Sequence, residues 1–173
     1  MPKQDINTQR RRLARLSAIQ ALYQMELADQ KSKRVVRDFN DHWFDNAAKS
    51  GNVTADREFF ELIVLGVVAE QDAVDAAISA KLNAKWKIHR LDITLRAIMR
   101  CGAYEILRMF DVPGVVIVDQ YVGLARDFYE GNEPNFVNAA LDKLAREYRT
   151  AEFGITDSMA KPADVPEDTP LDG

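Results

Sequence analysis

The sequence predicts an all-α protein built as a bundle of helices. Glycine and proline are scarce, at 8 and 6 of 173 residues, and long stretches consist mainly of alanine, leucine, arginine and glutamate. Apolar residues recur at steps of three and four, which is the period of an amphipathic helix. Only residues 115–118 resemble a strand, and helical spacing continues through them. We therefore expect helices throughout the folded part.

The first predicted helix covers about residues 7–28. Arg11, Arg12 and Arg15 fall largely outside its apolar stripe, so we expect all three at the surface. The stripe itself predicts the buried face and consists of residues spaced by three and four, namely Leu13, Leu16, Ile19, Tyr23 and Leu27.

The middle of the chain is less regular. We predict a weaker helical segment near residues 35–43 and a polar loop over residues 46–54. A long amphipathic helix then spans roughly residues 56–81. Residues 82–90 favour a short helix or a turn.

Three further helices are predicted in the second half. The first, over about residues 92–109, has Asp92 as a suitable N-cap. Pro113 opens the next, which continues to about residue 129, because proline is well placed in a first helical turn. The last ends near residue 149. Their predicted inward residues are Leu95, Ile98, Gly102 and Ile106, followed by Val137, Leu141, Leu144 and Tyr148.

Charge is segregated along the chain. From residue 151 to 173 there are six acidic residues and one lysine, a net charge of −5, which leaves +1 for the first 150 residues of a chain of net charge −4. Residues 154–173 have little to bury, and we expect a disordered acidic tail behind one domain of residues 1–153. The locally basic N-terminus could meet a polyanion.

No catalytic, metal or cofactor site is expected. His42 and His89 lie far apart with no second ligand at helical spacing, and the flanks of Cys101, the single cysteine, are those of a core thiol. The sequence contains none of the common phosphate-binding or hydrolase motifs. No segment is long and apolar enough to span a membrane, and the N-terminus does not have the sequence pattern of a secretory signal. We expect a cytoplasmic protein that is not an enzyme.

The remaining candidate for function is the basic start of the first helix. Arg10, Arg11 and Arg12 are consecutive, and Arg15 lies four and three residues after Arg11 and Arg12, within one helical turn. Guanidinium groups bind phosphate in a bidentate way and stack on unpaired bases. A solvated helix end is the alternative, and the arginines alone do not decide between the two.

Beyond the arginines, the chain resembles the NusB family. That family opens with a basic patch followed by an A-x-Q-A-L-Y segment, which matches Ala18–Tyr23 here. Further blocks follow in the family's order. They lie at residues 15–24, 90–100, 102–106, 112–113, 116–118, 136–138 and 141–143.

The resemblance implies a compact bundle of about seven helices in two packed halves. It also implies partners: the ribosomal protein NusE, a boxA-type single-stranded RNA in nascent ribosomal RNA leaders, and the antitermination complex on RNA polymerase. By the same resemblance, the RNA contacts would come from Arg10, Arg11, Arg12 and Arg15, together with Asn132 and Phe136. Phe136 could be a base-stacking platform or a packing residue only.

Some positions depart from the family pattern. Tyr129 and Ala139 replace the glycines usual in relatives, and Leu95 replaces a common acid near the expected NusE surface. Two other hypotheses stay open. The chain could be a helical module related to the N-terminal domain of ribosomal RNA cytosine methyltransferases, or a structural helical protein that does not bind RNA. Family members occur as monomers and as homodimers, and the sequence does not choose between them.

Overall fold

The computed structural model describes residues 3–83 and 86–154, and within them the prediction of an all-α protein is confirmed because no strand is present. If α2, the π-helical segment and α3 are counted as one continuous helix, the described residues form seven helices. The elements are α1 (Lys3–Ala28), α2 (Ser32–Asp38), the π-helical segment (Phe39–Phe44), α3 (Asp45–Lys49), α4 (Arg57–Ala69), α5 (Gln71–Ser79), α6 (Ile93–Arg108), α7 (Gly114–Phe128) and α8 (Glu133–Tyr148), with 3-10 turns at Ile88–Arg90 and Thr150–Phe153.

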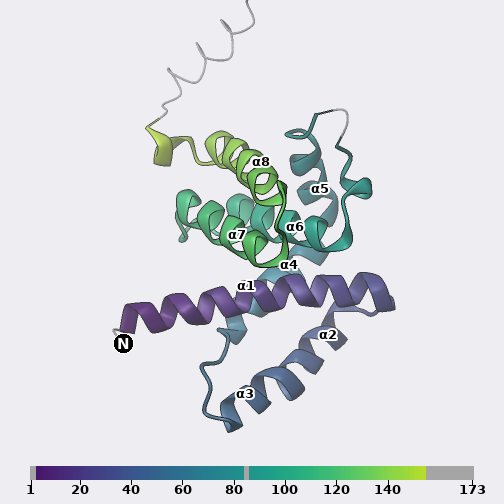
Figure 1. The fold of residues 1–173 in the computed structure, drawn as a ribbon, viewed down its shortest axis with the longest axis vertical. Coiled ribbons are helices and arrows are strands. Elements are labelled where there is room, and N and C mark those ends of the chain that lie inside the picture. Colours follow the sequence, from purple (N-terminus) through teal and green to yellow (C-terminus); the bar gives the residue numbers. More distant parts are fainter. Residues whose placement is uncertain (1–2, 84–85, 155–173) are drawn as a thin grey trace, which may run out of the picture.

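Helix α1 is the long rod that crosses the molecule, and it packs on α4 and α6 (Figure 1). Its predicted buried face is partly wrong, because Tyr23 and Leu27 are 40% and 63% exposed. The face of α1 that packs carries three alanines, whose small side chains let α1 approach the helices beneath it closely. The buried residues are Ala14, Ala18 and Ala21, together with Arg15 and Ile19.

The segment from α2 to α3 forms one aromatic-rich arm against α4. The ring centroid of Phe60 lies 5.3 Å from that of Phe39 and 5.0 Å from that of Phe44. Such contacts add to the free energy gained by burying the rings. The helix predicted over residues 35–43 is present but longer, and the predicted loop at 46–54 is wrong for its first residues because α3 ends at Lys49.

The single long helix predicted over residues 56–81 is wrong. It breaks at Glu70, whose φ and ψ are −117° and 27°, and α5 then turns to pack on α6. The side chain of Glu70 binds Arg108, whose Nη2 lies 2.6 Å from Glu70 Oε1. No proline lies at the break, so the residues around Glu70 give no local signal that the helix ends there.

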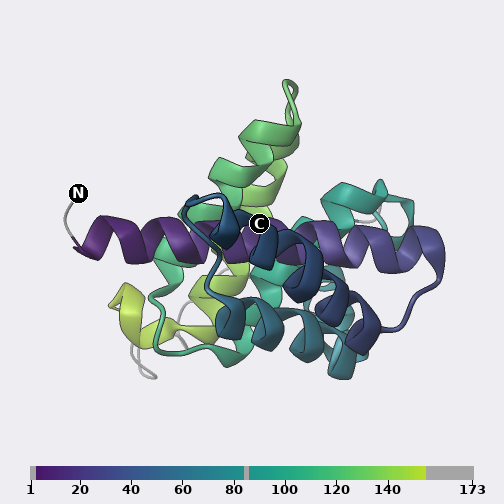
Figure 2. The ribbon, with the colours of Figure 1, turned by 90° about the horizontal axis from the view of Figure 1, so that it is seen from below.

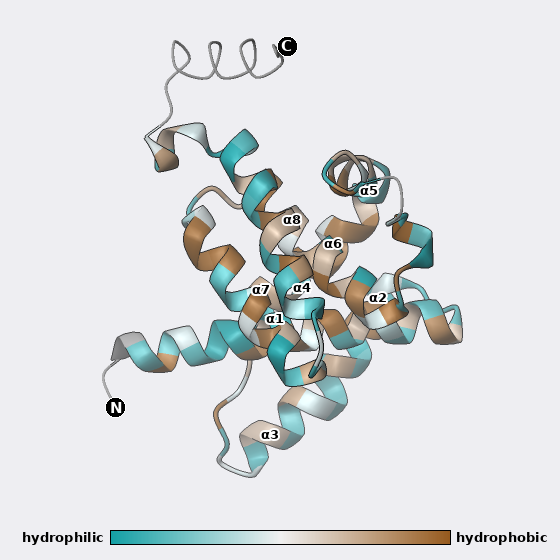
Figure 3. Ribbon diagram, turned by 45° about the horizontal axis from the view of Figure 1, so that its top comes forward, coloured by the Kyte–Doolittle hydropathy of each residue, from teal (hydrophilic) through white to brown (hydrophobic). Residues whose placement is uncertain are grey.

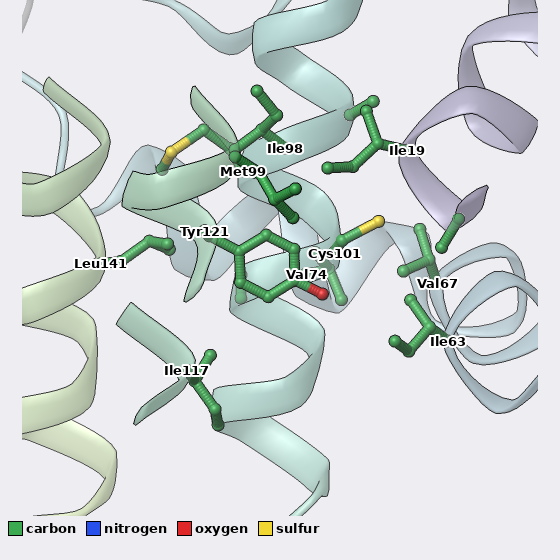
Figure 4. Close-up of a cluster of buried hydrophobic side chains, with 14 of the residues drawn as sticks. Ile19, Ile63, Val67, Val74, Ile98, Met99, Cys101, Ile117, Tyr121 and Leu141 are labelled. Atoms are coloured by element: carbon green, nitrogen blue, oxygen red, sulfur yellow. The ribbon is translucent and has the colours of Figure 1, made fainter. Parts of the chain in front are cut away.

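Helix α6 is the centre of the second half, and α7 and α8 form a hairpin that projects to one side of α1 (Figure 2). The side chains of six helices meet around the fully buried Tyr121, among them Ile19, Ile63, Ile98 and Leu141 (Figure 4). The residues predicted to point inward from α6 are buried, as are Val137, Leu141 and Leu144 of α8. Tyr148 is an error of prediction, since it is 43% exposed.

The chain beyond α8 is tied back to the bundle by Arg149, which is 3% exposed. Its guanidinium donates hydrogen bonds to four carbonyl oxygens at the end of α6 and in the connection to α7, those of Glu105, Ile106, Met109 and Val112. The carbonyls of Glu105 and Met109 also accept the backbone amides of Met109 and Val112, so Arg149 adds a second hydrogen bond to each of them at this helix end. Residues 155–173 of the predicted tail lie outside the described residues.

Among the described helices, none combines the length and the apolar character that crossing a membrane requires.

Candidate nucleic-acid interface

The N-terminal turns of α1 project from the body of the molecule and are mainly hydrophilic (Figure 3). The base of this projection is fixed by backbone and side-chain contacts with the connection before α4. The Nε of Arg10 donates to the carbonyl of Thr54 at 3.2 Å, and the amide of Asp56 donates to the carbonyl of Arg10 at 3.0 Å. The arginines that follow are therefore held on an ordered helix, and a shallow hollow forms beside Asn7, Thr8, Arg10, Arg11 and Asp56.

Arg11 lies over an aromatic ring. Its guanidinium carbon is 4.3 Å from the ring centroid of Phe59, and its Nε is 3.8 Å from Asp56 Oδ2. At this distance the ring attracts the guanidinium by a cation–π interaction. The side chain is still 38% exposed, so it can offer hydrogen-bond donors to a ligand.

Arg12 forms an exposed ion pair with the end of α7. Its Nη2 lies 2.7 Å from Asp127 Oδ2, with the two side chains 38% and 63% exposed. An ion pair this exposed contributes about 0–1 kcal/mol. A phosphate group could therefore take the place of Asp127 at little cost.

Arg15 does not belong to this surface, and its expected RNA contact is incompatible with its position. It is 2% exposed, and its guanidinium forms a bidentate pair with Glu105 of α6 at 2.8 and 3.0 Å. The hydroxyl of Tyr121 donates to the same carboxylate at 2.5 Å. Periodicity placed Arg15 at the surface because a buried partner far along the sequence cannot be seen from local spacing.

The buried cluster has shifted acid–base properties. Burial alone would lower the pKa of Arg15, but its hydrogen bond and ion pair with Glu105 raise it above its ordinary value. Burial, followed by the charge of Glu105, raises the pKa of Tyr121 well above its ordinary value. Arg15 therefore stays charged and Tyr121 stays a hydrogen-bond donor at any physiological pH, which is the behaviour of a structural cluster.

The second part of the predicted site forms around the start of α8. Asn132 is its exposed N-cap residue, and the half-buried ring of Phe136 lies 5.1 Å from the exposed ring of Trp86. A hollow of about 350 Å³ opens here. It is lined by Trp86, Arg90, Leu91, Asp92, Leu95, Asn132, Glu133 and Phe136.

Trp86 and Arg90 are functional candidates that the sequence did not single out. Trp86 is one of the two tryptophans of the chain, and it is 47% exposed. Together with Phe136 it presents two aromatic rings, and stacking of a base on an aromatic ring is the usual platform for single-stranded nucleic acid. A large aromatic residue beside Lys87 and Arg90, in a segment without clear helical spacing, was the available signal.

The C-terminal end of α7 joins the two parts. Asp127 pairs with Arg12, and two residues later the hydroxyl of Tyr129 donates to Asp92 Oδ1 at 2.6 Å, on the rim of the hollow. Burial and then this hydrogen bond raise the pKa of Tyr129. The end of α7 thus contacts both parts of the predicted site, Arg12 through Asp127 and the rim of the hollow through Tyr129.

Cys101 is buried, and burial raises its pKa well above the ordinary value. This position confirms the prediction of a core thiol, because a thiol that does not ionise is a poor nucleophile. His42 and His89 are both exposed on different elements. In the described part of the chain, no cluster of three or more histidine, cysteine or acidic side chains is arranged to hold a metal ion.

A family model described as the NusB family matches residues 12–146. The chain belongs to the NusB family. The transcription antitermination protein NusB of Maricaulis maris is 49% identical over 144 residues, which cover 83% of this chain and 90% of that protein. The protein of the same name from Caulobacter vibrioides is 42% identical over 142 residues, covering 82% and 95%.

Solved structures have the same fold. Thermotoga maritima NusB superposes with a TM-score of 0.70 and 28% identity, covering 84% of this chain and 97% of that one. A NusB chain from a complex of NusB, NusE and double-stranded RNA gives 0.66 at 20% identity, covering 81% and 98%. At that identity the second likeness concerns the fold alone. Within the family match lie Arg12, Asn132 and Phe136, whereas Arg10 and Arg11 directly precede it.

Proposed function

We propose that this chain is a transcription antitermination factor that acts as an RNA-binding adaptor. In this role it binds a boxA-type RNA in nascent ribosomal RNA leaders together with the ribosomal protein NusE, within the antitermination complex on RNA polymerase. Family membership and the printed function of relatives at 40–49% identity support the proposal. We place this activity in the cytoplasm, where nascent bacterial transcripts are found.

The observation that carries the proposal is that the end of α7 contacts two kinds of RNA-binding group, the arginines of α1 and a hollow with aromatic rings beside α8. Arg10, Arg11 and Arg12 supply guanidinium donors at the base of the projecting N-terminal end of α1. The hollow between Trp86 and Phe136 supplies aromatic rings. Recognition of single-stranded RNA combines these two features, phosphate neutralisation along the backbone and stacking of unpaired bases.

The ion pair between Arg12 and Asp127 gives this surface a way to accept phosphate. In the free protein the carboxylate neutralises the guanidinium at 2.7 Å. An incoming phosphate accepts the same hydrogen bonds and releases Asp127 to solvent. Binding then needs no rearrangement of the helices.

We further propose that the chain works by binding alone, with no catalytic step and no cofactor. A small set of phosphate contacts predicts weak RNA binding by the isolated protein. A partner that binds next to this surface would add contacts and increase affinity through a joined interface. The coupling must be reciprocal, because RNA and partner then raise each other's affinity by the same factor.

The test is a titration of a fluorescein-labelled boxA-like RNA, measured by anisotropy, with and without NusE. We expect weak, salt-dependent binding by the protein alone, tighter binding with NusE, and loss of most of that gain when the RNA sequence is scrambled. Calorimetry of the protein with NusE, in the absence and presence of RNA, measures the reciprocal factor. If NusE neither binds nor changes RNA affinity, the proposed function is wrong.

A further inference from the structure

The outward side of α4 carries an apolar groove that the proposed RNA surface does not use. Its floor consists of Leu62, Leu65 and Ala69 of α4 and the ring of Tyr104 of α6. Leu62 is 51% exposed, which is high for a leucine in the middle of a helix. The groove has a volume of about 530 Å³, enough for several apolar side chains.

Gly66 shapes the floor of this groove. A β-carbon at position 66 would collide with the ring of Tyr104, so the absence of a side chain is what allows that ring to lie against α4. The ring thereby fills the space between α4 and α6, and the groove stays shallow and open to a partner. Tyr104 is half-buried and presents a hydroxyl beside the apolar floor.

The rim of the groove is acidic. Glu58, Glu61 and Glu70 line it, and Asp72 lies in the adjoining hollow, which shares Ala69 and Glu70 with the groove. Glu70 is paired with Arg108. Among the described residues, Glu58 and Glu61 form no ion pair within 4.0 Å, so their charges are uncompensated.

We propose that this groove binds a basic amphipathic α-helix of a protein partner, with apolar side chains of the partner on Leu62, Leu65 and Ala69 and its lysines or arginines facing Glu58 and Glu61. The spacing of three and four residues along α4 matches the spacing of anchors on one face of a bound helix. The floor from residue 62 to 69 is about 10 Å long at 1.5 Å per residue, or two helical turns.

Charge excludes nucleic acid from this groove, because phosphate would be repelled by the uncompensated carboxylates. A strand-like peptide has no sheet edge to join, since the described residues contain no strand. The groove also lies apart from the arginines: on α4, Phe59 packs under Arg11, whereas Glu58, Glu61 and Leu62 face solvent. The protein would thus bind RNA on one surface and a basic helix on another.

The test uses a synthetic probe in place of the unidentified partner. The probe is a fluorescein-labelled peptide of lysine, alanine and leucine, about fourteen residues long, with its leucines on one helical face. A scrambled peptide of the same composition has its leucines spread around the helix. Because the acidic C-terminal segment of the full-length protein attracts any basic peptide, only the difference between the two peptides reports on the groove. We expect the amphipathic probe to bind more tightly than the scrambled one.

Two sets of variants locate that difference. Leu62→Arg should weaken binding of the amphipathic probe about tenfold, whereas Val115→Arg, at a residue of α7 that is 58% exposed, should leave it unchanged. Glu58→Gln combined with Glu61→Gln should weaken binding and reduce its salt dependence, whereas Asp111→Asn combined with Asp119→Asn removes the same charge elsewhere and should not. Equal binding of the two peptides, or equal effects of Leu62→Arg and Val115→Arg, would overturn the proposal. RNA affinity of Leu62→Arg should match that of the unmodified protein.

Discussion

Arg15 and Glu105 form a bidentate ion pair in the interior of the bundle, 90 positions apart in the sequence. The Arg15 side chain is 3% exposed and that of Glu105 is fully buried. Tyr121 completes the cluster, so a single carboxylate links α1, α6 and α7. This contact divides the arginine motif into Arg10, Arg11 and Arg12, which remain partly exposed, and Arg15, which serves the fold.

Replacing Arg15 by methionine should strongly destabilise the protein. Removing one partner leaves the buried Glu105 charge uncompensated, and we expect the free energy of unfolding to fall by about 3–5 kcal/mol. Urea denaturation followed by circular dichroism measures the change. Arg12→Met is the matched control and should cost about 0–1 kcal/mol, because its ion pair with Asp127 is exposed. Equal losses in the two variants would show that the buried pair does not stabilise the bundle.

Replacing both Arg11 and Arg12 by alanine should weaken RNA binding without unfolding the protein. Each phosphate contact that is lost should reduce the slope of log affinity against log salt by roughly 0.7 for a single strand. Anisotropy titrations at several salt concentrations measure that slope. The control is Arg34→Ala with Arg37→Ala, which removes two exposed arginines from α2. If the control has the same effect, the RNA contacts on α1 are assigned wrongly.

Truncation after Phe153 should leave the melting temperature nearly unchanged, because the acidic residues that follow have little to bury. Truncation after Tyr148 should lower it markedly. The shorter chain loses Arg149, whose guanidinium satisfies carbonyls at the end of α6, and Glu152, whose Oε1 accepts the amide hydrogen of Gly114 at 2.6 Å. Differential scanning calorimetry of the two truncated chains distinguishes these cases. A large loss from the first truncation would mean that the segment after Phe153 packs on the bundle.

Glu152 should make stability depend on pH in the acid range. The hydrogen bond from Gly114, followed by contacts with Arg149, lowers the pKa of Glu152 in the folded protein. Its stabilising contribution is therefore fully present above the ordinary glutamate pKa of about 4.3, and it is lost as pH falls through the lower folded pKa. Glu152→Gln should be less stable than the unmodified protein at pH 7, and this difference should shrink toward pH 3. Glu130 is exposed, and Glu130→Gln is the control. The stability difference between this variant and the unmodified protein should not shrink in the same way between pH 7 and pH 3.

Much of the fold could be predicted from local pattern. Asp92 was predicted as an N-cap, and its Oδ1 accepts the amide hydrogen of Leu95 at 3.0 Å. The buried faces of α6 and most of α8 follow directly from their apolar spacing. These elements were predictable because their caps and periodicity are local properties, and the ordered family blocks then indicated the whole bundle.

The candidate site was less predictable. Asn132 and Phe136 line one hollow, yet Trp86 in the same hollow was missed because its exposure depends on how the segment before α6 packs against α8. Ionic contacts decided other outcomes. Helix α4 ends at Glu70, whose side chain pairs with Arg108 of α6. Because Arg108 lies in a different helix, this contact cannot be predicted from the local spacing of apolar residues.

The sequence by itself determined the helical class, the N-cap of α6 at Asp92, the proline at the start of α7, the family, and the basic character of the first helix. Tertiary structure alone decided which face of α1 is buried and which arginines remain available. The physical reason is that Arg15 can be buried only because Glu105 compensates its charge and accepts its hydrogen bonds, while Tyr121 donates to the same carboxylate. Such compensation is created when distant helices meet, whereas helix formation and capping depend on residues within a few positions of one another.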